Sequence, residues 1–272
     1  MQTIKRPIGI FDSGIGGLSV VKEIQRVLPG EGLVYFGDTA HLPYGTKSKE
    51  TIVRFSREIV RFLLQFRVKA IVVACHTASS FSLATLRREF DLPIIGVVRP
   101  GAEEALRMTH SGRIGILGTR STIQSGSYFR EIQRLNPRAK VFSQSCPLFV
   151  PLVEEGHLED DIATRVAEEY LRPLKRLHVD TVILGCTHYP LLKRVIGKVL
   201  GKGVCLVDSS HETAEQVKRL LEKDHLASLN GRAPQRCRFY VSDEPNRFSK
   251  VGGGLLRDRI RAVQKVSLPC IG

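Results

Sequence analysis

Two short apolar runs, each ending in a cysteine, constrain the fold of this chain more than any other feature. Residues 68–77 read VKAIVVACHT, and residues 179–190 read VDTVILGCTHYP. A continuous β-branched run of this length is typical of a strand buried on both faces of a parallel sheet. Cys75 and Cys186 are therefore expected at the carboxyl ends of two strands, where open α/β sheets carry their chemistry.

A second pair of similar segments recurs at nearly the same offset. Residues 8–14 (IGIFDSG) resemble residues 114–120 (IGILGTR), an offset of 114 − 8 = 106, and the cysteines are 186 − 75 = 111 residues apart. Two pairs at similar offsets predict an internal duplication into two α/β units, each with a mostly parallel sheet flanked by helices. We expect domain one to span residues 1–98 plus 208–272 and domain two to span 99–207, with the active site in the cleft shared by the two domains.

Local patterns predict several further elements. The apolar stripe along residues 48–66 recurs at helical spacing and predicts a helix packed on the core. Helices are also expected over residues 79–90 and 102–108, with a loop around 145–147. Residues 237–243 are expected to form an antiparallel edge strand.

Composition indicates a soluble globular protein of one or two domains. The 272 residues are 42% hydrophobic and 25% charged, and no apolar run approaches the roughly 20 residues that span a bilayer. Residues 1–7 lead directly into an expected strand, so we expect no signal peptide and a cytoplasmic protein. Free thiols are expected, because the six cysteines include no C-x-x-C pair: Cys75, Cys146, Cys186, Cys205, Cys237 and Cys270.

A net charge of +14 raises the question of a polyanionic partner. The basic residues are spread along the chain without a block of interleaved aromatics. A solvated basic surface is therefore the favoured interpretation, and a nucleic-acid partner stays a less favoured alternative. Nothing predicts a membrane partner.

Cofactor and metal signatures are weak. The glycines of residues 14–17 lie between an expected strand and helix, but their G-x-G-G spacing lacks the third glycine of a dinucleotide fingerprint, and Asp12 would repel a pyrophosphate. The eight histidines show no H-E-x-x-H-like spacing. We therefore expect no metal and no cofactor.

Two cysteines facing one cleft suit a 1,1-proton transfer at a weak carbon acid such as an amino-acid α-carbon. Inversion needs a base on one face and an acid on the other, and a thiolate and a thiol can exchange these roles. Because an unperturbed cysteine has a pKa of roughly 8.5, one thiol must be helped toward the thiolate at neutral pH. Asp12, at the end of the first strand, and His188, two residues beyond Cys186, are the candidate helpers. Inert packing is the competing interpretation for a single buried cysteine, but it is weaker for two at duplicated positions.

The chain resembles the aspartate/glutamate racemase family, and glutamate racemases in particular, over nearly its whole length. The motifs that carry the resemblance are residues 11–17 (FDSGIGG), 37–39 (GDT) with 43–45 (PYG), 74–79 (ACHTAS), 151–154 (PLVE) and 185–190 (GCTHYP). Together they are highly specific.

The resemblance implies a cofactor-independent enzyme that makes D-glutamate for bacterial cell walls. It implies two pseudo-symmetric α/β domains, a homodimer, and a C-terminal segment that completes domain one. The implied acid/base pair is Cys75 and Cys186, assisted by Asp12 and His188. The implied substrate-binding residues are Asp12, Ser13, Tyr44, Gly45, His76, Thr77, Glu154, Thr187 and His188.

Two positions depart from the family pattern. His76 stands where the family usually has Asn, so it either ion-pairs with Cys75 or crowds the site. Arg99 stands where the family usually has an acid, which adds to the basic surface and affects a domain junction or dimer contact. Two other functions remain open: a related two-cysteine aspartate racemase, or a weak racemase that binds DNA or a protein through its basic surface.

Overall fold

The computed structural model describes residues 6–228, 237–256, 260 and 262–268, so residues 1–5 and Cys270 lie outside the described residues. The chain forms two compact units. Unit 1 comprises Met1–Val97 and Ser210–Gly272, and unit 2 comprises Val98–Ser209. These limits fall within two residues of the boundaries expected from the sequence, and the assignment of the units as domains stays a prediction.

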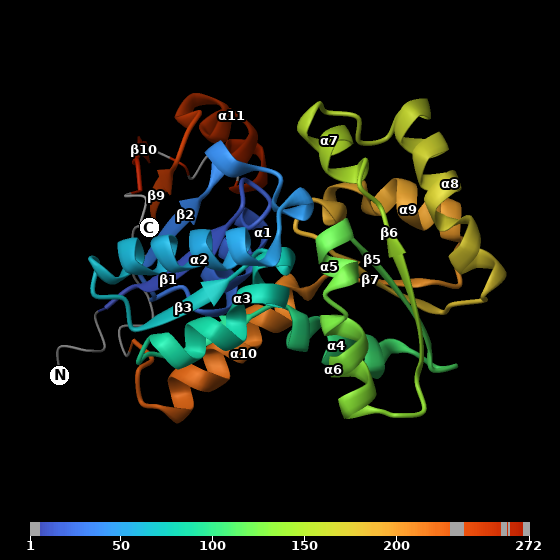
Figure 1. Cartoon of the computed structure of the whole chain (residues 1–272), viewed down its shortest axis with the longest axis horizontal. Coiled ribbons are helices and arrows are strands. Elements are labelled where there is room, and N and C mark those ends of the chain that lie inside the picture. Colours follow the sequence, from blue (N-terminus) through green and yellow to red (C-terminus); the bar gives the residue numbers. More distant parts are fainter. Residues whose placement is uncertain (1–5, 229–236, 257–259, 261, 269–272) are drawn as a thin grey trace. The chain divides into compact units, whose positions relative to one another are not determined.

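Unit 1 contains a parallel sheet in the strand order β10-β9-β2-β1-β3-β4 (Figure 1). Its strands are β1 (Ile8–Asp12), β2 (Leu33–Gly37), β3 (Ala70–Val73), β4 (Ile94–Gly96), β9 (Cys237–Val241) and β10 (Val263–Lys265). Its helices are α1 (Leu18–Val27), α2 (Lys49–Leu64), α3 (His76–Glu89), α10 (Ser209–Lys223) and α11 (Pro245–Leu256), with short 3₁₀ turns η2 (Thr39–His41) and η3 (Tyr44–Thr46).

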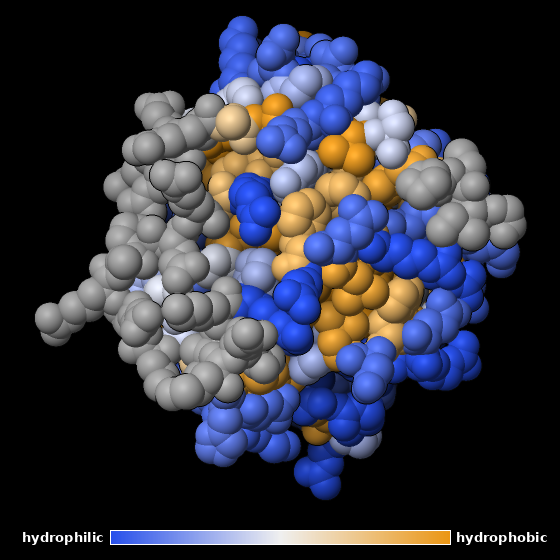
Figure 2. Space-filling model, turned by 90° about the vertical axis from the view of Figure 1, so that its left-hand side faces the viewer, coloured by the Kyte–Doolittle hydropathy of each residue, from blue (hydrophilic) through white to orange (hydrophobic). Residues whose placement is uncertain are grey.

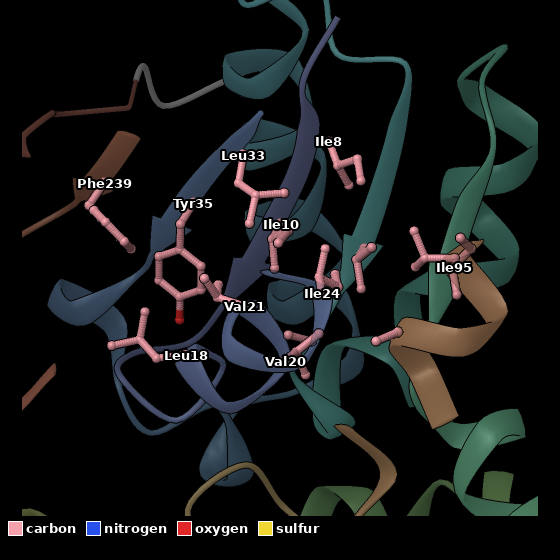
Figure 3. Packing of buried hydrophobic residues seen from close by; sticks show 14 of the residues in the cluster. Ile8, Ile10, Leu18, Val20, Val21, Ile24, Leu33, Tyr35, Ile95 and Phe239 are labelled. Atoms are coloured by element: carbon pink, nitrogen blue, oxygen red, sulfur yellow. The ribbon is translucent and has the colours of Figure 1, made fainter. Parts of the chain in front are cut away.

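Helices cover both faces of this sheet because successive strand residues point to opposite faces. Ile8 and Ile10 of β1 pack in one apolar cluster with residues of α1, α10 and α11. Phe11, on the opposite face, packs in another cluster with residues of α2 and α3. Figure 3 shows the first cluster, in which side chains of β1 and β2 meet those of α1. The near-continuous burial of β1, β2 and β3 follows from this double cover.

Unit 2 contains a parallel sheet in the order β6-β5-β7-β8. Its strands are β5 (Arg113–Gly118), β6 (Lys140–Ser145), β7 (Thr181–Gly185) and β8 (Cys205–Val207). Its helices are α4 (Val98–Met108), α5 (Arg120–Gln124), α6 (Ser127–Leu135), α7 (Phe149–Glu154), α8 (Asp161–Arg176) and α9 (Lys193–Leu200), with the 3₁₀ turn η4 (Tyr189–Leu192). Residues of α4 and α6 share one apolar cluster, and residues of α7, α8 and α9 share the other.

The two sheets repeat one topology, which supports the internal duplication. Strands β2-β1-β3-β4 of unit 1 and β6-β5-β7-β8 of unit 2 occur in the same spatial order relative to their order along the chain. Unit 1 adds β9 and β10 beyond β2. The predicted α/β class, with parallel sheets flanked by helices, is confirmed.

The expected antiparallel edge strand at residues 237–243 is wrong. Strand β9 pairs in parallel with β2 on one side and with β10 on the other, so it lies inside the sheet. Its apolar residues Phe239, Tyr240 and Val241 are buried accordingly. Parallel pairing suits a segment that arrives after a helix, here α10, because the chain has crossed back over the sheet.

Helix boundaries also differ from expectation. Helix α3 begins at His76, three residues earlier than expected, because Cys75 occupies its N-cap position. Helix α4 begins at Val98 and contains Pro100 in its first turn, where the missing proline N–H costs no helical hydrogen bond. Helix α7 follows the turn at Cys146–Pro147 and brings Glu154 to its last position.

The surface of the described chain combines single exposed apolar side chains with an apolar stretch on one face. No described helix is both long enough and apolar enough to cross a membrane. Figure 2 shows a face on which hydrophilic side chains cross an apolar stretch. The large exposed hydrophobic residues belong to different parts of the chain: Leu64, Phe129, Leu148, Ile162 and Val251.

Candidate active site

The first candidate thiol, Cys75, lies directly beyond the carboxyl end of β3. It is only 5% exposed and is the N-cap residue of the 14-residue helix α3. Its sulfur lies 3.8 Å from the Ser13 hydroxyl oxygen, within reach of a weak S–H···O hydrogen bond. The partial positive charge at a helix N-terminus favours a thiolate over a thiol. The N-terminus of α3 thus supplies one contribution that favours the ionised form of Cys75.

Asp12 ends β1, the strand paired with β3, and is held by the glycine turn that follows. Its carboxylate oxygen Oδ2 accepts hydrogen bonds from the N–H groups of Gly14 (3.1 Å) and Gly17 (3.0 Å). Burial, followed by the charges of Asp12 and Cys75, raises the pKa of Tyr35 well above its ordinary value. The charges of Asp12 and Cys75 therefore both disfavour ionisation of the Tyr35 phenol. The Tyr35 hydroxyl donates a hydrogen bond to the Gly14 carbonyl (2.7 Å). The N–H groups of these glycines thus bind a carboxylate of the protein itself. A carboxylate at this point would repel the phosphates of a nucleotide, as the sequence also indicated.

Tyr44 also lies within electrostatic reach of both groups. Burial raises the pKa of Tyr44 well above its ordinary value, with further contributions from Asp38, Cys75 and Asp12. Its hydroxyl donates a 2.6 Å hydrogen bond to Asp38. The predicted residues of unit 1 lie at the end of β1 or on the segments that follow β1, β2 and β3: Asp12, Ser13, Tyr44, Gly45, Cys75, His76 and Thr77.

His76 is a neutral imidazole in this environment. It is the first residue of α3 and is 4% exposed. Burial lowers its pKa from 6.5 to about 3. At neutral pH the ring therefore carries no charge with which to pair with a Cys75 thiolate, whereas the N-terminus of α3 offers positive potential.

The second candidate thiol, Cys186, lies directly beyond β7 and is 7% exposed. Its sulfur lies 3.9 Å from Nδ1 of His188, and Nε2 of the same ring lies 2.7 Å from Oε1 of Glu154. Because an ionised carboxylate only accepts hydrogen bonds, Nε2 of a neutral His188 carries the proton and Nδ1 presents its lone pair to Cys186. This order of groups matches a nucleophile or base, an imidazole and an orienting carboxylate.

Unit 2 thus gathers Glu154, Cys186, Thr187 and His188, and it adds two neighbours that the sequence did not single out. Burial, followed by the nearby Cys186, raises the pKa of Cys146 well above its ordinary value. Tyr189 is fully buried and donates its hydroxyl to the Cys146 carbonyl (2.8 Å). Cys146 therefore stays a thiol at neutral pH. The sequence around Cys146 contains no motif that would predict its position near Cys186.

Arg99, the other departure from the family pattern, is paired within unit 2. Its guanidinium lies 2.7 Å from Glu103 of α4 and 3.9 Å from Glu131 of α6. In the part of the chain that the structure describes, no group of three or more His, Cys, Asp or Glu side chains is arranged to hold a metal ion.

Comparisons with known proteins assign the class of enzyme. The family model described as Asp/Glu/Hydantoin racemase matches residues 8–217. The chain therefore belongs to this family and is an amino-acid racemase, an isomerase.

Within that family, several relatives that are similar over nearly the whole chain are named glutamate racemase. A glutamate racemase of Geobacter metallireducens is 48% identical over 263 residues, which cover 97% of each chain. The crystal structure of glutamate racemase isoform RacE1 from Bacillus anthracis superposes with a TM-score of 0.93 at 39% identity, covering 97% of this chain and 98% of that one. Glutamate racemase from Francisella tularensis, solved in complex with D-glutamate, gives 0.91 at 38% identity, covering 98% of this chain and 100% of that one.

Proposed function

We propose that this chain interconverts L- and D-glutamate by a cofactor-independent, two-cysteine 1,1-proton transfer. The observation that carries the proposal is the repeated placement of a buried cysteine beyond the third strand of each duplicated unit, after β3 and after β7. Asp12 ends β1, the strand paired with β3, and His188 lies 3.9 Å from Cys186. The relatives named glutamate racemase support the substrate.

In this mechanism one thiolate removes the α-proton and the other thiol returns a proton to the opposite face. Cys186 becomes a thiolate when His188 accepts its proton at Nδ1, and Glu154 stabilises the resulting imidazolium. Cys75 draws on the N-terminus of α3, with Asp12 as the nearby carboxylate that exchanges protons with it. Following the family pattern, we assign Cys75 to the D-isomer and Cys186 to the L-isomer. The chemistry requires both sulfurs to reach opposite faces of one α-carbon.

The remaining predicted residues are assigned to substrate. Ser13, Tyr44, Gly45, His76 and Thr77 of unit 1, with Thr187 of unit 2, supply hydroxyl, imidazole and backbone groups for the ammonium and carboxylates of glutamate. Asp12 and His188 serve both substrate and thiols. Glu154 is assigned a role through His188, on the strength of the 2.7 Å contact.

We further propose that the protein is a cytoplasmic homodimer supplying D-glutamate for peptidoglycan. A polyanion-binding role is less favoured, because many arginines are already paired with neighbouring carboxylates. Such pairs include Arg26–Glu23, Arg107–Glu104, Arg134–Glu131, Arg172–Glu169 and Arg219–Glu212. Binding to DNA, if it occurred, would weaken steeply with salt, so an electrophoretic shift at low salt tests that alternative.

The deciding experiment is α-proton exchange in deuterated water without added cofactor, offering L- and D-glutamate separately. Wild type is expected to exchange and invert both isomers, and Cys75→Ser and Cys186→Ser are expected to lose inversion. Cys205→Ser is the matched control, because Cys205 pairs with Thr181 at the amino ends of β8 and β7, whereas Cys186 follows the carboxyl end of β7. Exchange with L- or D-aspartate at a higher rate than with glutamate would favour the aspartate alternative. Unimpaired inversion in either site variant would refute the two-thiol mechanism.

A further inference from the structure

We propose that Asp38 is a positioning residue that, with Ser242, holds the Tyr44–Gly45 segment in its ligand-binding conformation. The inference deepens the proposed function, since it rests on the assignment of Tyr44 and Gly45 to substrate. It links the loop after β2 to the loop after β9, about 200 residues later in the chain.

Asp38 is a buried carboxylate whose oxygens are already engaged by hydrogen-bond donors. It is 1% exposed and immediately follows β2. Its Oδ2 accepts from the Tyr44 hydroxyl (2.6 Å), and its Oδ1 accepts from the Ser242 hydroxyl (2.8 Å). Nδ1 of His41 lies 2.8 Å from Oδ1 and 3.0 Å from Oδ2. A carboxylate offers about four acceptor sites, so these contacts occupy it almost fully. Such a group suits positioning better than proton transfer.

The same two loops are joined by further hydrogen bonds between side chains and the backbone. The Thr39 hydroxyl donates to the Asp243 carbonyl (2.5 Å) and accepts from the Asp243 N–H (2.9 Å). The Ala40 N–H donates to the Ser242 hydroxyl oxygen (2.8 Å). Ser242 therefore accepts from one loop residue and donates to another, which places it at the centre of the junction. The Lys265 ammonium lies 2.5 Å from the Asp243 carboxylate and ties β10 to the same point.

Aromatic side chains of the loop after β2 also pack against helix α2. The His41 ring stacks on Phe55 of α2 with centroids 4.1 Å apart, and Tyr44 packs against Phe55 at 5.8 Å. Tyr44 is 1% exposed and commits its hydroxyl proton to Asp38. The side chain of Tyr44 therefore works as an anchor, so that removing either end of its bond to Asp38 frees the segment.

The test compares Asp38→Asn, Tyr44→Phe, Ser242→Ala and the Asp38→Asn/Tyr44→Phe double variant. Removing a hydrogen bond to a buried charged group costs enough to change an equilibrium by about 10- to 100-fold. We expect Asp38→Asn to raise KM for glutamate at least 10-fold while kcat changes less, and Ser242→Ala to act in the same direction. Because both Asp38→Asn and Tyr44→Phe disrupt the same Tyr44–Asp38 bond, the double variant should have nearly the KM of the worse single variant. Unchanged KM in Asp38→Asn, or effects that multiply in the double variant, would overturn the proposal.

Asp180→Asn is the matched control. Asp180 directly precedes β7, at the amino ends of the strands of the unit 2 sheet. Like Asp38, it accepts three hydrogen bonds, here from Thr109, His110 and Ser111. Its substitution should lower stability without a change in KM, which separates positioning from general destabilisation. Hydrogen exchange of residues 39–46 in the unliganded protein gives a readout independent of activity. Exchange should accelerate in Asp38→Asn and Ser242→Ala but not in Asp180→Asn. If glutamate proved not to be a substrate, this measurement would still decide the positioning role, and equal exchange in all variants would refute it.

Discussion

Oε1 of Glu154 lies 2.7 Å from Nε2 of His188, across 34 residues of sequence, and so determines which ring nitrogen is free to face Cys186. Glu154 ends α7, and His188 follows the β7 strand by three residues. The family motifs assign Glu154 to the substrate, and His188 both to the substrate and to the assistance of Cys186. The geometry instead gives Glu154 a role that acts through the imidazole.

Glu154→Gln tests this role. A glutamine side chain can donate as well as accept, so it no longer fixes the proton on Nε2 of His188. We expect the rate of inversion to fall about 10-fold, equivalent to about 1.4 kcal/mol of transition-state stabilisation. The rate is measured by α-proton exchange with L-glutamate. Glu155→Gln, on the exposed neighbouring residue, should retain the wild-type rate; equal loss in both variants would argue against the His188 contact.

His76 should make the folded state less stable in acid. Its pKa is about 3 in the folded protein and about 6.5 when unfolded, so the unfolded state binds a proton that the native state excludes. The stabilisation is complete above pH 6.5 and is lost as pH falls toward 3, by about 2 kcal/mol between pH 7 and pH 5. Urea unfolding at the two pH values measures it. His76→Asn should remove about that much of the pH dependence, whereas His110→Asn, on an exposed histidine, should leave it unchanged.

Lys69 and Glu31 form a buried ion pair at the amino end of the unit 1 strands. Lys69 directly precedes β3, whereas Cys75 lies beyond the carboxyl end of that strand. Lys69 Nζ lies 2.6 Å from Glu31 Oε2 and donates to the Leu226 carbonyl (2.7 Å), while the Ser228 N–H donates to Glu31 (2.7 Å). Lys69→Met would leave the buried carboxylate of Glu31 without its ionic partner and should lower the free energy of unfolding by about 3–5 kcal/mol.

The matched control for that pair is Arg57→Met, which breaks the surface pair with Glu89 (Nε–Oε2 2.7 Å) and should cost about 1 kcal/mol or less. Both values come from urea denaturation. Similar losses in the two variants would contradict the distinction between the buried and the surface pair.

Gly17 should tolerate no side chain. A Cβ there would lie 2.5 Å from Asp12 Cβ and 2.8 Å from the Tyr35 hydroxyl oxygen, so the carboxylate beside Cys75 would have to move. We expect Gly17→Ala to lower stability by about 1–3 kcal/mol and to abolish most racemase activity. Gly254→Ala, in α11 with open space around it, should gain about 0.5–1 kcal/mol and leave activity unchanged. A fully active Gly17→Ala variant would refute the requirement for close packing at Asp12.

Local patterns predict most of the fold and the candidate thiols. The buried strands before Cys75 and Cys186 are recognisable because parallel strands covered on both faces must be continuously apolar. The recurrence of two segments at similar offsets predicts the duplication that the strand orders of the two sheets support. The sequence also predicts four further site residues, because they lie at the ends of expected strands or in the turns that follow: Asp12, His76, Thr187 and His188.

The tertiary structure alone decided the partnerships between distant segments. The parallel placement of β9 within the sheet, the contact of Glu154 with His188, and the junction of Asp38 with Ser242 join residues 34 to about 200 positions apart. A hydrogen bond of this kind depends on where two strand ends come to lie in a sheet, and neither residue's neighbours in the chain carry that information. The sequence by itself therefore determined the strands, the duplication and the two thiols, whereas packing of the sheets determined which side chains orient them.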